Sequence, residues 1–461
     1  MSSKRHPDRR THRDRSANPS RRRFIQSSAA MGVGFWALGG LSWAPARRRA
    51  KIELVQFGCI GVGGKGDSDS NDANRLGKVV AICDIDDNTL NAAANRFPDA
   101  KKFNDFRIML AEMGDSIDAV TVSTPDHTHA IAAMRAMDHG KHCFCQKPLT
   151  HSLEEARTMG EIARANGLAT QMGNQGTADT NLRKAAAILR AGALGPVKEV
   201  HVWTNRPVWP QGCERPPVRE APKHVHWDLW LGPAPHRPDG VWSEQRGWGP
   251  LDAYHPFNWR GWWDFGTGAL GDMACHTLNM PFMGLDLRDP VSVEAETSGH
   301  NRDSYPSWSR IKYEFPARGE RGPLTLWWYD GGQKPGAELV GEEPADSGTF
   351  VKGDAGSLYS PGDYAGEYRL IGDVSEPAVE VPQSPGHFEE LIRAIETGEP
   401  AMSNFPDYAG PLTETVLLGN LAVWSGGRVE WDPRKMQVTN DGSDLERIIR
   451  KEYPEGWGLE G

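Results

Sequence analysis

The chain has 461 residues, of which 38% are hydrophobic and 25% are charged, and its formal net charge is −9. This length allows two domains with their own cores, and this composition excludes a disordered or fibrous protein. Residues 1–46 carry nine Lys and Arg against two Asp and Glu, so the remainder is acidic and has no basic face. We therefore expect no nucleic acid among the partners.

Residues 1–46 resemble a bacterial twin-arginine signal peptide. A polar leader precedes Ser20–Gln26 (SRRRFIQ), an uncharged stretch rich in Gly and Ala runs from Ser27 to Leu41, and Ala44-Pro45-Ala46 follows. This is the order of a basic region, an apolar region and a cleavage site. A membrane anchor and a basic nucleic-acid arm are the alternatives, but the apolar stretch is too short for a stable span. We expect cleavage near Ala46 and a periplasmic or secreted protein without a stable membrane anchor.

The stretch from Lys51 to Asp84 predicts a nucleotide-binding turn between two strands. One apolar run ends at Gly61-Val62-Gly63-Gly64-Lys65-Gly66, and a second, Val79–Cys83, ends at Asp84. In a dinucleotide-binding fold these glycines allow a tight turn and a close approach to the pyrophosphate, and an acid about twenty residues on binds the ribose 2′-hydroxyl. A plain glycine turn is the alternative. We predict that the cofactor is bound by Gly61, Gly63, Gly64, Gly66 and Asp84.

The residues that follow Asp84 favour NAD over NADP. They are Ile85-Asp86-Asp87, and no arginine is nearby. The 2′-phosphate of NADP would meet repulsion there and no basic partner. We therefore expect NAD as the cofactor and regard NADP as the less favoured one.

Helical and strand-like patterns alternate as far as residue 172. Helices are expected over residues 88–95, 107–113, 130–138 and from the capping box Ser152–Glu155 to Gly167, and strands over 118–123, 142–145 and 168–172. This order predicts a doubly wound parallel sheet in residues 51–175, with function at the carboxyl ends of the strands. Polar residues follow three strands, at Thr124–His129, Gln146-Lys147 and Asn174-Gln175. We assign to the cofactor site Thr124, Pro125, His129, Gln146 and Lys147.

After a strand expected over residues 197–204, residues 205–263 form an irregular stretch that is rich in tryptophan. Irregular stretches of this length in enzymes are usually functional, and the apolar face of an indole ring suits the apolar face of a sugar. We expect the rings to line a cleft, and the alternative is that most of them pin the loop. The tryptophans are Trp203, Trp209, Trp227, Trp230, Trp242, Trp248, Trp259, Trp262 and Trp263.

Asp272 and His276 share one face of a short helix expected after Gly266–Gly271, because they are four residues apart. Histidine suits a general base, since its ordinary pKa is near neutrality. A surface Asp–His pair is the alternative, and a metal site lacks a third ligand. Cys143-Phe144-Cys145 also lacks zinc-site spacing, so we expect no metal, and the six cysteines indicate no particular disulfide.

The last third of the chain is less informative. Strand-like runs occur between residues 311 and 330, and residues 334–348 are expected to form a surface loop. Helical patterns over 387–397 and 412–424 are expected to cover the sheet of the second domain.

Four motifs in this order resemble the Gfo/Idh/MocA family of nicotinamide-dependent sugar and polyol oxidoreductases, and the exported subset with twin-arginine signals in particular. They are G-x-G-x-x-G, S-T-P-D-H-T-H at 123–129, K-P at 147–148 and D-x-x-x-H at 272–276. The resemblance implies a Rossmann domain over 51–175 and an α/β domain over 176–461, whose open, mostly antiparallel sheet supports a sugar site and a homo-oligomer interface. It also implies His276 as the general base, Asp272 as an orienting or substrate-binding carboxylate, and Lys147 as a hydrogen-bond donor to the reacting oxygen.

Two departures from the family pattern bear on this site. Gln146 stands where the family usually has glutamate, so Lys147 loses a possible ion-pair partner, and Ala274 stands where many members have glycine. We expect an exported oxidoreductase that acts on a sugar, polyol or glycoside with tightly held NAD, loaded before export. A redox-neutral NAD-dependent glycoside hydrolase or lyase, and a sugar-binding protein without turnover, are the alternatives.

Overall fold

The computed structural model of the protein describes residues 54–215, 221–235, 254–440 and 445–459. The predicted signal peptide, Trp242 and Trp248 lie outside these ranges. Within them, we find no helix that combines the length and the apolar character needed to cross a membrane.

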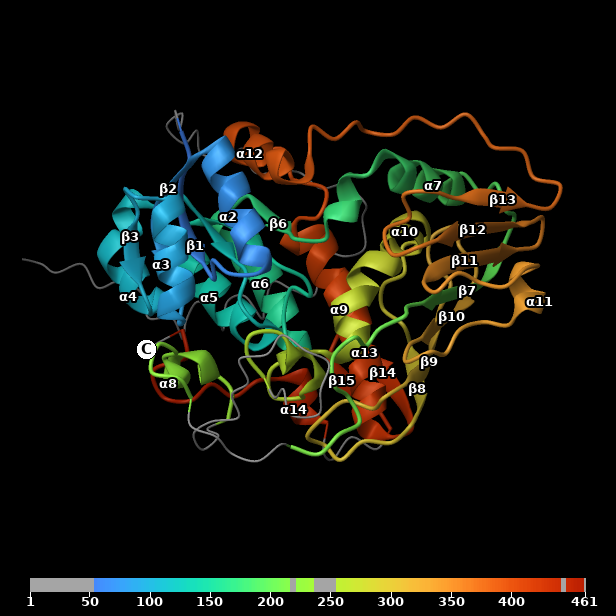
Figure 1. The fold of residues 1–461 in the computed structure, drawn as a ribbon. Coiled ribbons are helices and arrows are strands. Elements are labelled where there is room, and N and C mark those ends of the chain that lie inside the picture. The colour runs from blue at the N-terminus through green and yellow to red at the C-terminus, as the bar shows by residue number, and fades with distance from the viewer. Residues whose placement is uncertain (1–53, 216–220, 236–253, 441–444, 460–461) are drawn as a thin grey trace, which may run out of the picture. The chain divides into compact units, whose positions relative to one another are not determined.

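The first sheet is parallel throughout and confirms the predicted doubly wound architecture (Figure 1). Its strands, in spatial order, are β3 (Lys101–Phe103), β2 (Lys78–Cys83), β1 (Gln56–Ile60), β4 (Ala119–Val122), β5 (His142–Cys145) and β6 (Thr170–Met172). The helices between them are α2 (Lys65–Leu76), α3 (Asp87–Arg96), α4 (Phe106–Met113), α5 (Asp126–Asp138) and α6 (Leu153–Asn166). Strand β3 was not predicted, because its sequence KKF has a single apolar residue.

Local sequence patterns predict one helix boundary correctly and miss another. The capping box of Ser152 and Glu155 is present, and α6 ends at Gly167 with a φ of 60°, as expected. Helix α5, by contrast, begins four residues before the predicted Ala130. Its first turn, D-H-T-H, is polar and has no apolar periodicity, although the side chains of that turn are buried.

The second sheet has nine strands and is mostly antiparallel, as the family resemblance implied; β7 and β10 form its parallel pair. Side chains alternate along β9, where Ile311 and Tyr313 are buried and Arg310 is exposed. In spatial order the strands are β13 (Arg369–Ile371), β12 (Ser357–Pro361), β11 (Gly348–Gly353), β7 (Val197–Trp203), β10 (Leu324–Tyr329), β9 (Ser309–Phe315), β8 (Ser292–Thr297), β14 (Arg428–Asp432) and β15 (Gln437–Val438).

The helices that follow the first sheet pack against both sheets. Helix α13 (Gly410–Ser425) contacts α6 of the first domain and β8 of the second sheet, and it lies between the two sheets in Figure 1 with α9 (Gly268–Thr277). The other helices are α7 (Thr180–Arg190), α8 (Trp227–Leu231), α10 (Asn279–Leu285), α11 (Ala337–Val340), α12 (His387–Thr397) and α14 (Glu446–Ile449). Helix α11 interrupts the loop expected over residues 334–348.

Helix α12 corrects one expectation, because it covers the first sheet and not the second. The ring of Phe388 lies 4.8 Å from that of Phe144 on β5 and 5.9 Å from that of Phe57 on β1. Leu391 belongs to the same buried cluster. The amphipathic pattern of residues 387–397 predicts the helix and its apolar face, but it carries no information about which sheet receives that face.

Candidate active site

The loop from Gly61 to Gly66 forms the cradle that the glycine pattern predicts. Gly61 has a φ of 77°, and a Cβ there would lie 2.6 Å from the carbonyl oxygen of Ser123. A Cβ on Gly66 would lie 2.1 Å from the carbonyl oxygen of Gly61. Helix α2 starts at Lys65, so its positive dipole end adjoins the loop, and the Gly66 and Asp67 N–H groups of its first turn donate to the Gly63 and Gly64 carbonyl oxygens. Backbone N–H groups, a helix start and glycines without side chains fit a pyrophosphate.

Asp84 lies at the carboxyl end of β2 and is tied to this loop. Its Oδ2 accepts a hydrogen bond from the Val62 N–H at 3.0 Å, and its Oδ1 accepts one from the Asp86 N–H at 3.0 Å. Burial raises the pKa of the Asp84 carboxyl, and these two bonds offset part of that rise. Each carboxylate oxygen retains a lone pair, so the group fits a ribose hydroxyl.

Asp86, two residues further on, has histidine neighbours that the sequence did not indicate. Its Oδ1 lies 3.1 Å from Nδ1 of His224, and its Oδ2 lies 3.7 Å from Nε2 of His255. Burial alone would raise the pKa of Asp86, but these histidines help lower it to about 2. Both come from the tryptophan-rich stretch, which therefore reaches the end of β2.

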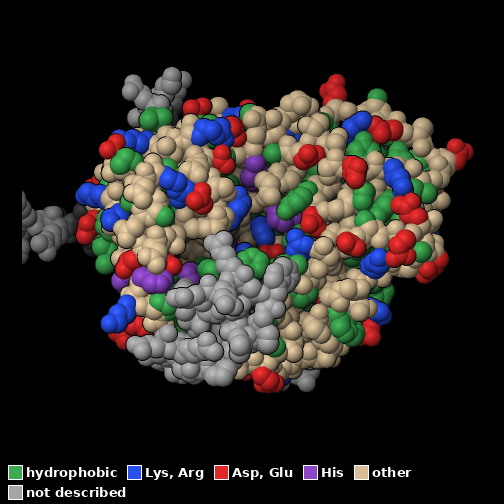
Figure 2. Space-filling view, in the orientation of Figure 1, with side chains coloured by type: hydrophobic (Ala, Val, Ile, Leu, Met, Phe, Trp, Pro, Cys, Tyr) green, Lys and Arg blue, Asp and Glu red, His purple; other side chains and the backbone are tan. Residues whose placement is uncertain are grey.

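A cleft of about 920 Å³ joins the glycine loop to α9. Its volume is at the upper end of the ~300–1,000 Å³ typical of small-molecule sites. Histidine and basic side chains gather in the hollowed middle of the face shown in Figure 2. Gly66 packs beneath the loop, and the other predicted site residues line the cleft: Gly61, Gly63, Gly64, Asp84, Thr124, Pro125, His129, Gln146, Lys147, Asp272 and His276.

Lys147 and Asp272 form an ion pair across the two domains. The Lys147 Nζ donates to Oδ1 and to the main-chain carbonyl of Asp272, each at 2.8 Å. Oδ1 also accepts from Nε of Arg260 at 3.2 Å. Burial alone would raise the pKa of Asp272, but the charges of Lys147 and Arg260 hold it well below its usual range. Asp272 is thus an ionised carboxylate that orients Lys147.

His276 lies one helical turn after Asp272 and lines the same cleft. Its side chain is buried, and its Nδ1 has no hydrogen-bond partner among the described residues. Burial, and then the charge of Lys147, lower the pKa of His276 well below its ordinary value. The imidazole is therefore neutral near pH 7 and can accept a proton.

Gln146, the departure from the family pattern, bonds to a buried acid. Its Nε2 donates to Oδ2 of Asp69 at 2.8 Å. The Asp69 carboxylate also accepts from Oγ of Ser123 at 2.7 Å and from Nζ of Lys65 at 2.8 Å. A glutamate at position 146 would set two carboxylates against each other, so the neutral amide suits this surrounding. Lys147 forms its ion pair with Asp272 and not with a carboxylate at position 146.

His129 links two strand ends. Its Nδ1 lies 2.8 Å from the Pro148 carbonyl oxygen, and its Nε2 lies 2.8 Å from that of Thr124. Burial lowers the pKa of His129 to about 4, so near pH 7 its single N–H serves one of these carbonyls. Both nitrogens face the main chain, and the ring borders the cofactor cleft as a link between β4 and β5.

Asp126, the first residue of α5, is a buried carboxyl in the cleft that we did not predict as a site residue. Its Oδ2 accepts a hydrogen bond from Oγ1 of Thr267 at 2.6 Å. Burial raises the pKa of Asp126 to about 7, although this bond and the charge of Arg260 act in the opposite direction. The group therefore changes its charge near neutral pH.

The tryptophan-rich stretch both lines the cleft and packs on itself. Trp209, Trp230 and Trp259 line the cleft, and Trp230 and Trp259 also belong to a buried aromatic cluster with Trp227 and Trp262, which do not line it. Trp263 is buried against Tyr305, and Trp203 of β7 is buried against Tyr359. Both readings of the stretch are thus correct for some of its rings.

Two further residues that line the cleft near Asp272 and His276 were not predicted from the sequence. Arg260 holds its guanidinium 4.2 Å from the ring centre of Trp259 and 4.4 Å from that of Phe257. The Tyr364 ring lies 4.9 Å from that of His276, edge to face, and is 42% exposed in the cleft. Each is a single residue in a segment without periodicity, so no pattern pointed to it.

The six cysteines are all free, and five of them are buried. Among the described residues, no three His, Cys, Asp or Glu side chains lie together as a set that could hold a metal ion.

The first domain supplies a parallel sheet, a glycine cradle, a strand-end acid and Lys147, and the second domain supplies Asp272 and the neutral His276. Together they define the class of nicotinamide-dependent oxidoreductases. Residues 55–174 match the description "Oxidoreductase family, NAD-binding Rossmann fold", and residues 179–459 match "Oxidoreductase family, C-terminal alpha/beta domain". The chain belongs to the Gfo/Idh/MocA oxidoreductase family.

Named relatives agree with this class. An inositol 2-dehydrogenase from Salmonella typhimurium is 28% identical over 155 residues, which are 32% of this chain and 45% of that protein. The chain thus spans less than half the length of this curated relative. The WlbA dehydrogenase from Bordetella pertussis, in complex with NADH and UDP-GlcNAcA, has a TM-score of 0.57 at 16% identity, over 82% of this chain and 99% of that one. An aldose-aldose oxidoreductase from Caulobacter crescentus has a TM-score of 0.53 at 17% identity, over 82% and 100%.

Proposed function

We propose that the protein transfers a hydride between NAD and a hydroxyl-bearing carbon of a sugar, polyol or glycoside. The observation that carries this proposal is the Lys147–Asp272 ion pair beside the neutral His276, in the same cleft as the glycine cradle. The names of the relatives, an inositol dehydrogenase and an aldose-aldose oxidoreductase, support this substrate class.

The proposed mechanism divides the work among three side chains. His276 accepts the proton of the substrate hydroxyl, while Lys147 donates a hydrogen bond to the same oxygen and stabilises charge as it develops. Asp272 holds the Lys147 ammonium in place. The bound nicotinamide supplies the acceptor for the hydride that leaves the substrate carbon, which becomes a carbonyl.

NAD is the proposed cofactor because two carboxylates, Asp84 and Asp86, lie where the 2′-phosphate of NADP would approach. Extraction of nucleotide from the protein as purified should yield mainly NAD. Mainly NADP in the extract would contradict this assignment.

We further propose that the protein is exported through the twin-arginine route, works in the periplasm or outside the cell, and keeps its cofactor as a prosthetic group. The twin-arginine pattern supports export, and a compartment without a nicotinamide pool requires retention. The nicotinamide is then re-oxidised in place, either by a second carbonyl substrate or by return of the hydride to the first. We also propose that the protein forms a homo-oligomer, which light scattering would detect.

The test is to dialyse the purified mature protein extensively, and then to measure bound nucleotide and turnover without added NAD. A panel of sugars and aryl glycosides should give sugar oxidation coupled to reduction of a second sugar. Release of the aglycone would point to the redox-neutral hydrolase or lyase instead. Loss of the nucleotide, with activity that depends strictly on added NAD, would defeat the prosthetic assignment and favour an ordinary dehydrogenase.

A further inference from the structure

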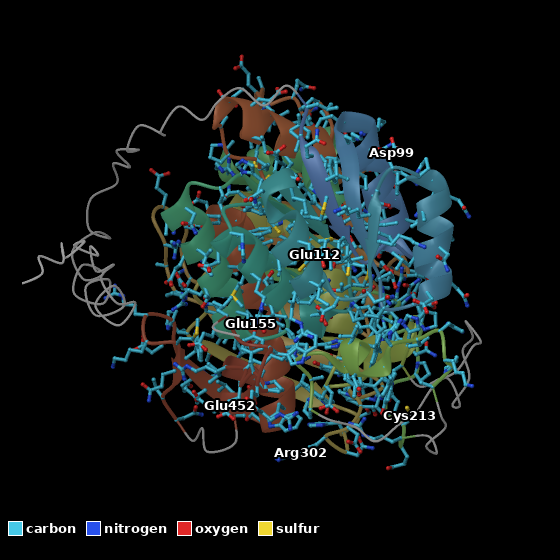
Figure 3. All side chains as sticks on the ribbon, turned by 90° about the vertical axis from the view of Figure 1, so that its left-hand side faces the viewer. Asp99, Glu112, Glu155, Cys213, Arg302 and Glu452 are labelled. Carbon is cyan, nitrogen blue, oxygen red and sulfur yellow. The ribbon has the colours of Figure 1, made fainter. Side chains whose placement is uncertain are left out.

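The C-terminal segment, residues 451–459, returns from the second domain to the first. The hydroxyl of Tyr453 donates to a carboxylate oxygen of Glu155 on α6, and Figure 3 shows Glu155 above Glu452, the neighbour of Tyr453. Arg107 and Arg135, on α4 and α5, donate to the carbonyl oxygen of Gly456 at 3.1 and 3.0 Å. Contacts with three helices of the first domain therefore hold this segment in place.

Trp457 is the residue of this segment that reaches the cleft. The guanidinium of Arg107 lies 4.0 Å from its ring centre, and the ring of Phe106 lies 6.1 Å away. A Cβ on Gly232, the residue that ends α8, would lie 3.5 Å from its ring. In Figure 1 the tail passes α8 toward the end marked C. Arg107 covers one face of the indole ring, but Trp457 as a whole is half-buried and lines the cleft.

This part of the cleft is the end where adenosine binds in a dinucleotide fold. It is bordered by Asp84 and Asp86 after β2 and by Phe106 after β3. Strands β2 and β3 lie on one side of β1, and β5, which leads to Lys147, lies on the other. A dinucleotide crosses the crevice between these two sides, with its adenosine ribose on the acid that follows β2.

Residues 221–235 form a second wall at the same end. Val225 pairs with Asp86 as an antiparallel bridge, the Asp87 N–H donates to the His224 carbonyl oxygen at 2.9 Å, and the His226 N–H donates to that of Ile85 at 2.9 Å. This segment therefore lies across the end of β2 and, through Gly232, meets Trp457.

We propose that Trp457 is an adenine-binding residue of this protein, and that residues 451–459 close the adenosine end of the cleft and slow the release of the cofactor. The inference rests on the proposed dinucleotide cofactor. An indole face suits a purine, because every base has a π-face that stacks on an aromatic ring.

The test uses wild-type protein and Trp457→Ala from which bound nucleotide has been stripped, and it compares their binding of NADH and of two fragments, ADP-ribose and nicotinamide mononucleotide, by calorimetry. Trp457→Ala should weaken NADH and ADP-ribose about tenfold or more and leave the mononucleotide unchanged. Trp457→Phe should keep most of the affinity. The matched control is Trp308→Ala, because Trp308 is also half-buried beneath an arginine, Arg310 at 5.9 Å, but does not line the cleft.

A second measurement uses the stripped wild-type protein. NADH should slow hydrogen exchange of backbone amides in residues 451–459, and nicotinamide mononucleotide should not. Equal ADP-ribose affinity for wild type and Trp457→Ala, or no change in exchange of the segment, would overturn the inference about Trp457. Failure of the stripped wild-type protein to bind any of these nucleotides, together with an extract that contains no nicotinamide nucleotide, would instead refute the proposed cofactor, so the two failures are distinguishable.

Discussion

Position 146 shows how one residue is selected by a neighbour far away in the sequence. Gln146 donates to Asp69, 77 residues earlier on α2, and the carboxylate of Asp69 is almost fully buried. The charge that a glutamate would bring to position 146 is therefore already present at position 69. The amide and the acid form one hydrogen-bonded unit.

Gln146→Glu should lower the free energy of unfolding by about 3 kcal/mol, because it adds an uncompensated buried charge beside Asp69. Urea denaturation measures the change. The double variant Asp69→Asn with Gln146→Glu keeps one amide and one carboxylate and should recover more than half of the loss. A single variant as stable as wild type would show that the pair is not coupled.

His276→Ala should reduce kcat about 10²–10⁴-fold, because the substrate hydroxyl loses its proton acceptor. Nucleotide content should stay at the wild-type level, since His276 belongs to the second domain and the glycine cradle to the first. His139→Ala, a change at an exposed histidine, is the control. A His276→Ala enzyme with more than about a tenth of the wild-type rate would disprove the assigned role.

Asp126 should make stability depend on pH. Its folded-state pKa of about 7 lies above the ordinary value of 3.8, so between these pH values the folded protein binds this proton more tightly than the unfolded chain. The contribution of Asp126 to the free energy of unfolding therefore falls as pH rises from about 4 to about 7. Asp126→Asn removes this fall and should gain up to about 4 kcal/mol over wild type across that range.

Urea unfolding at several pH values from 4.5 to 7.5 tests this difference. Asp99→Asn is the control, because the Asp99 side chain is 82% exposed on the first domain (Figure 3). Parallel pH profiles of the wild-type protein and Asp126→Asn would rule out the raised pKa.

At the scale of elements, α12 is fixed by a buried ion pair as well as by its apolar face. Nη2 of Arg183 on α7 lies 2.5 Å from Oε1 of Glu390, and both side chains are almost fully buried. The Met402 N–H donates to the other carboxylate oxygen. This pair joins α7, which follows the first sheet, to α12, which covers that sheet.

Glu390→Gln should lower the free energy of unfolding by about 3–5 kcal/mol, because it leaves the Arg183 charge buried without its counter-ion. The neighbouring residue provides the control, since Glu389 pairs with Arg75 at the surface. Glu389→Gln should cost no more than about 1 kcal/mol. Equal losses for the two variants in urea denaturation would contradict the difference in burial.

The elements differ in how much of them the sequence predicts. The glycine cradle, Asp84, Lys147, Asp272 and His276 follow from local patterns together with the family resemblance, because each occupies a fixed place relative to a strand end or a helix. The contributions of Arg260, Tyr364, Asp69 and Trp457 depend on contacts between distant segments, which leave no periodic trace. The sheet that α12 covers was mispredicted for the same reason.

At the scale of the molecule, the two sheets share elements that come from both halves of the chain. Helix α13 contacts both α6 and β8, α12 completes the cover of the first sheet, and residues 451–459 contact α4, α5 and α6. The cleft is therefore formed by segments from both halves of the described chain. Its cofactor end and its catalytic end each contain residues from both domains.

The position of α12 in the chain also delays completion of the first domain's core during synthesis. The first sheet is complete at Met172, but the helix that covers Phe57 and Phe144 begins at His387, about 200 residues later. At roughly 5–20 residues per second, a ribosome needs about 10–40 s to make that interval. During this time Phe57 on β1 and Phe144 on β5 lack the cover of α12, and the early domain cannot reach its final core until most of the later one has emerged.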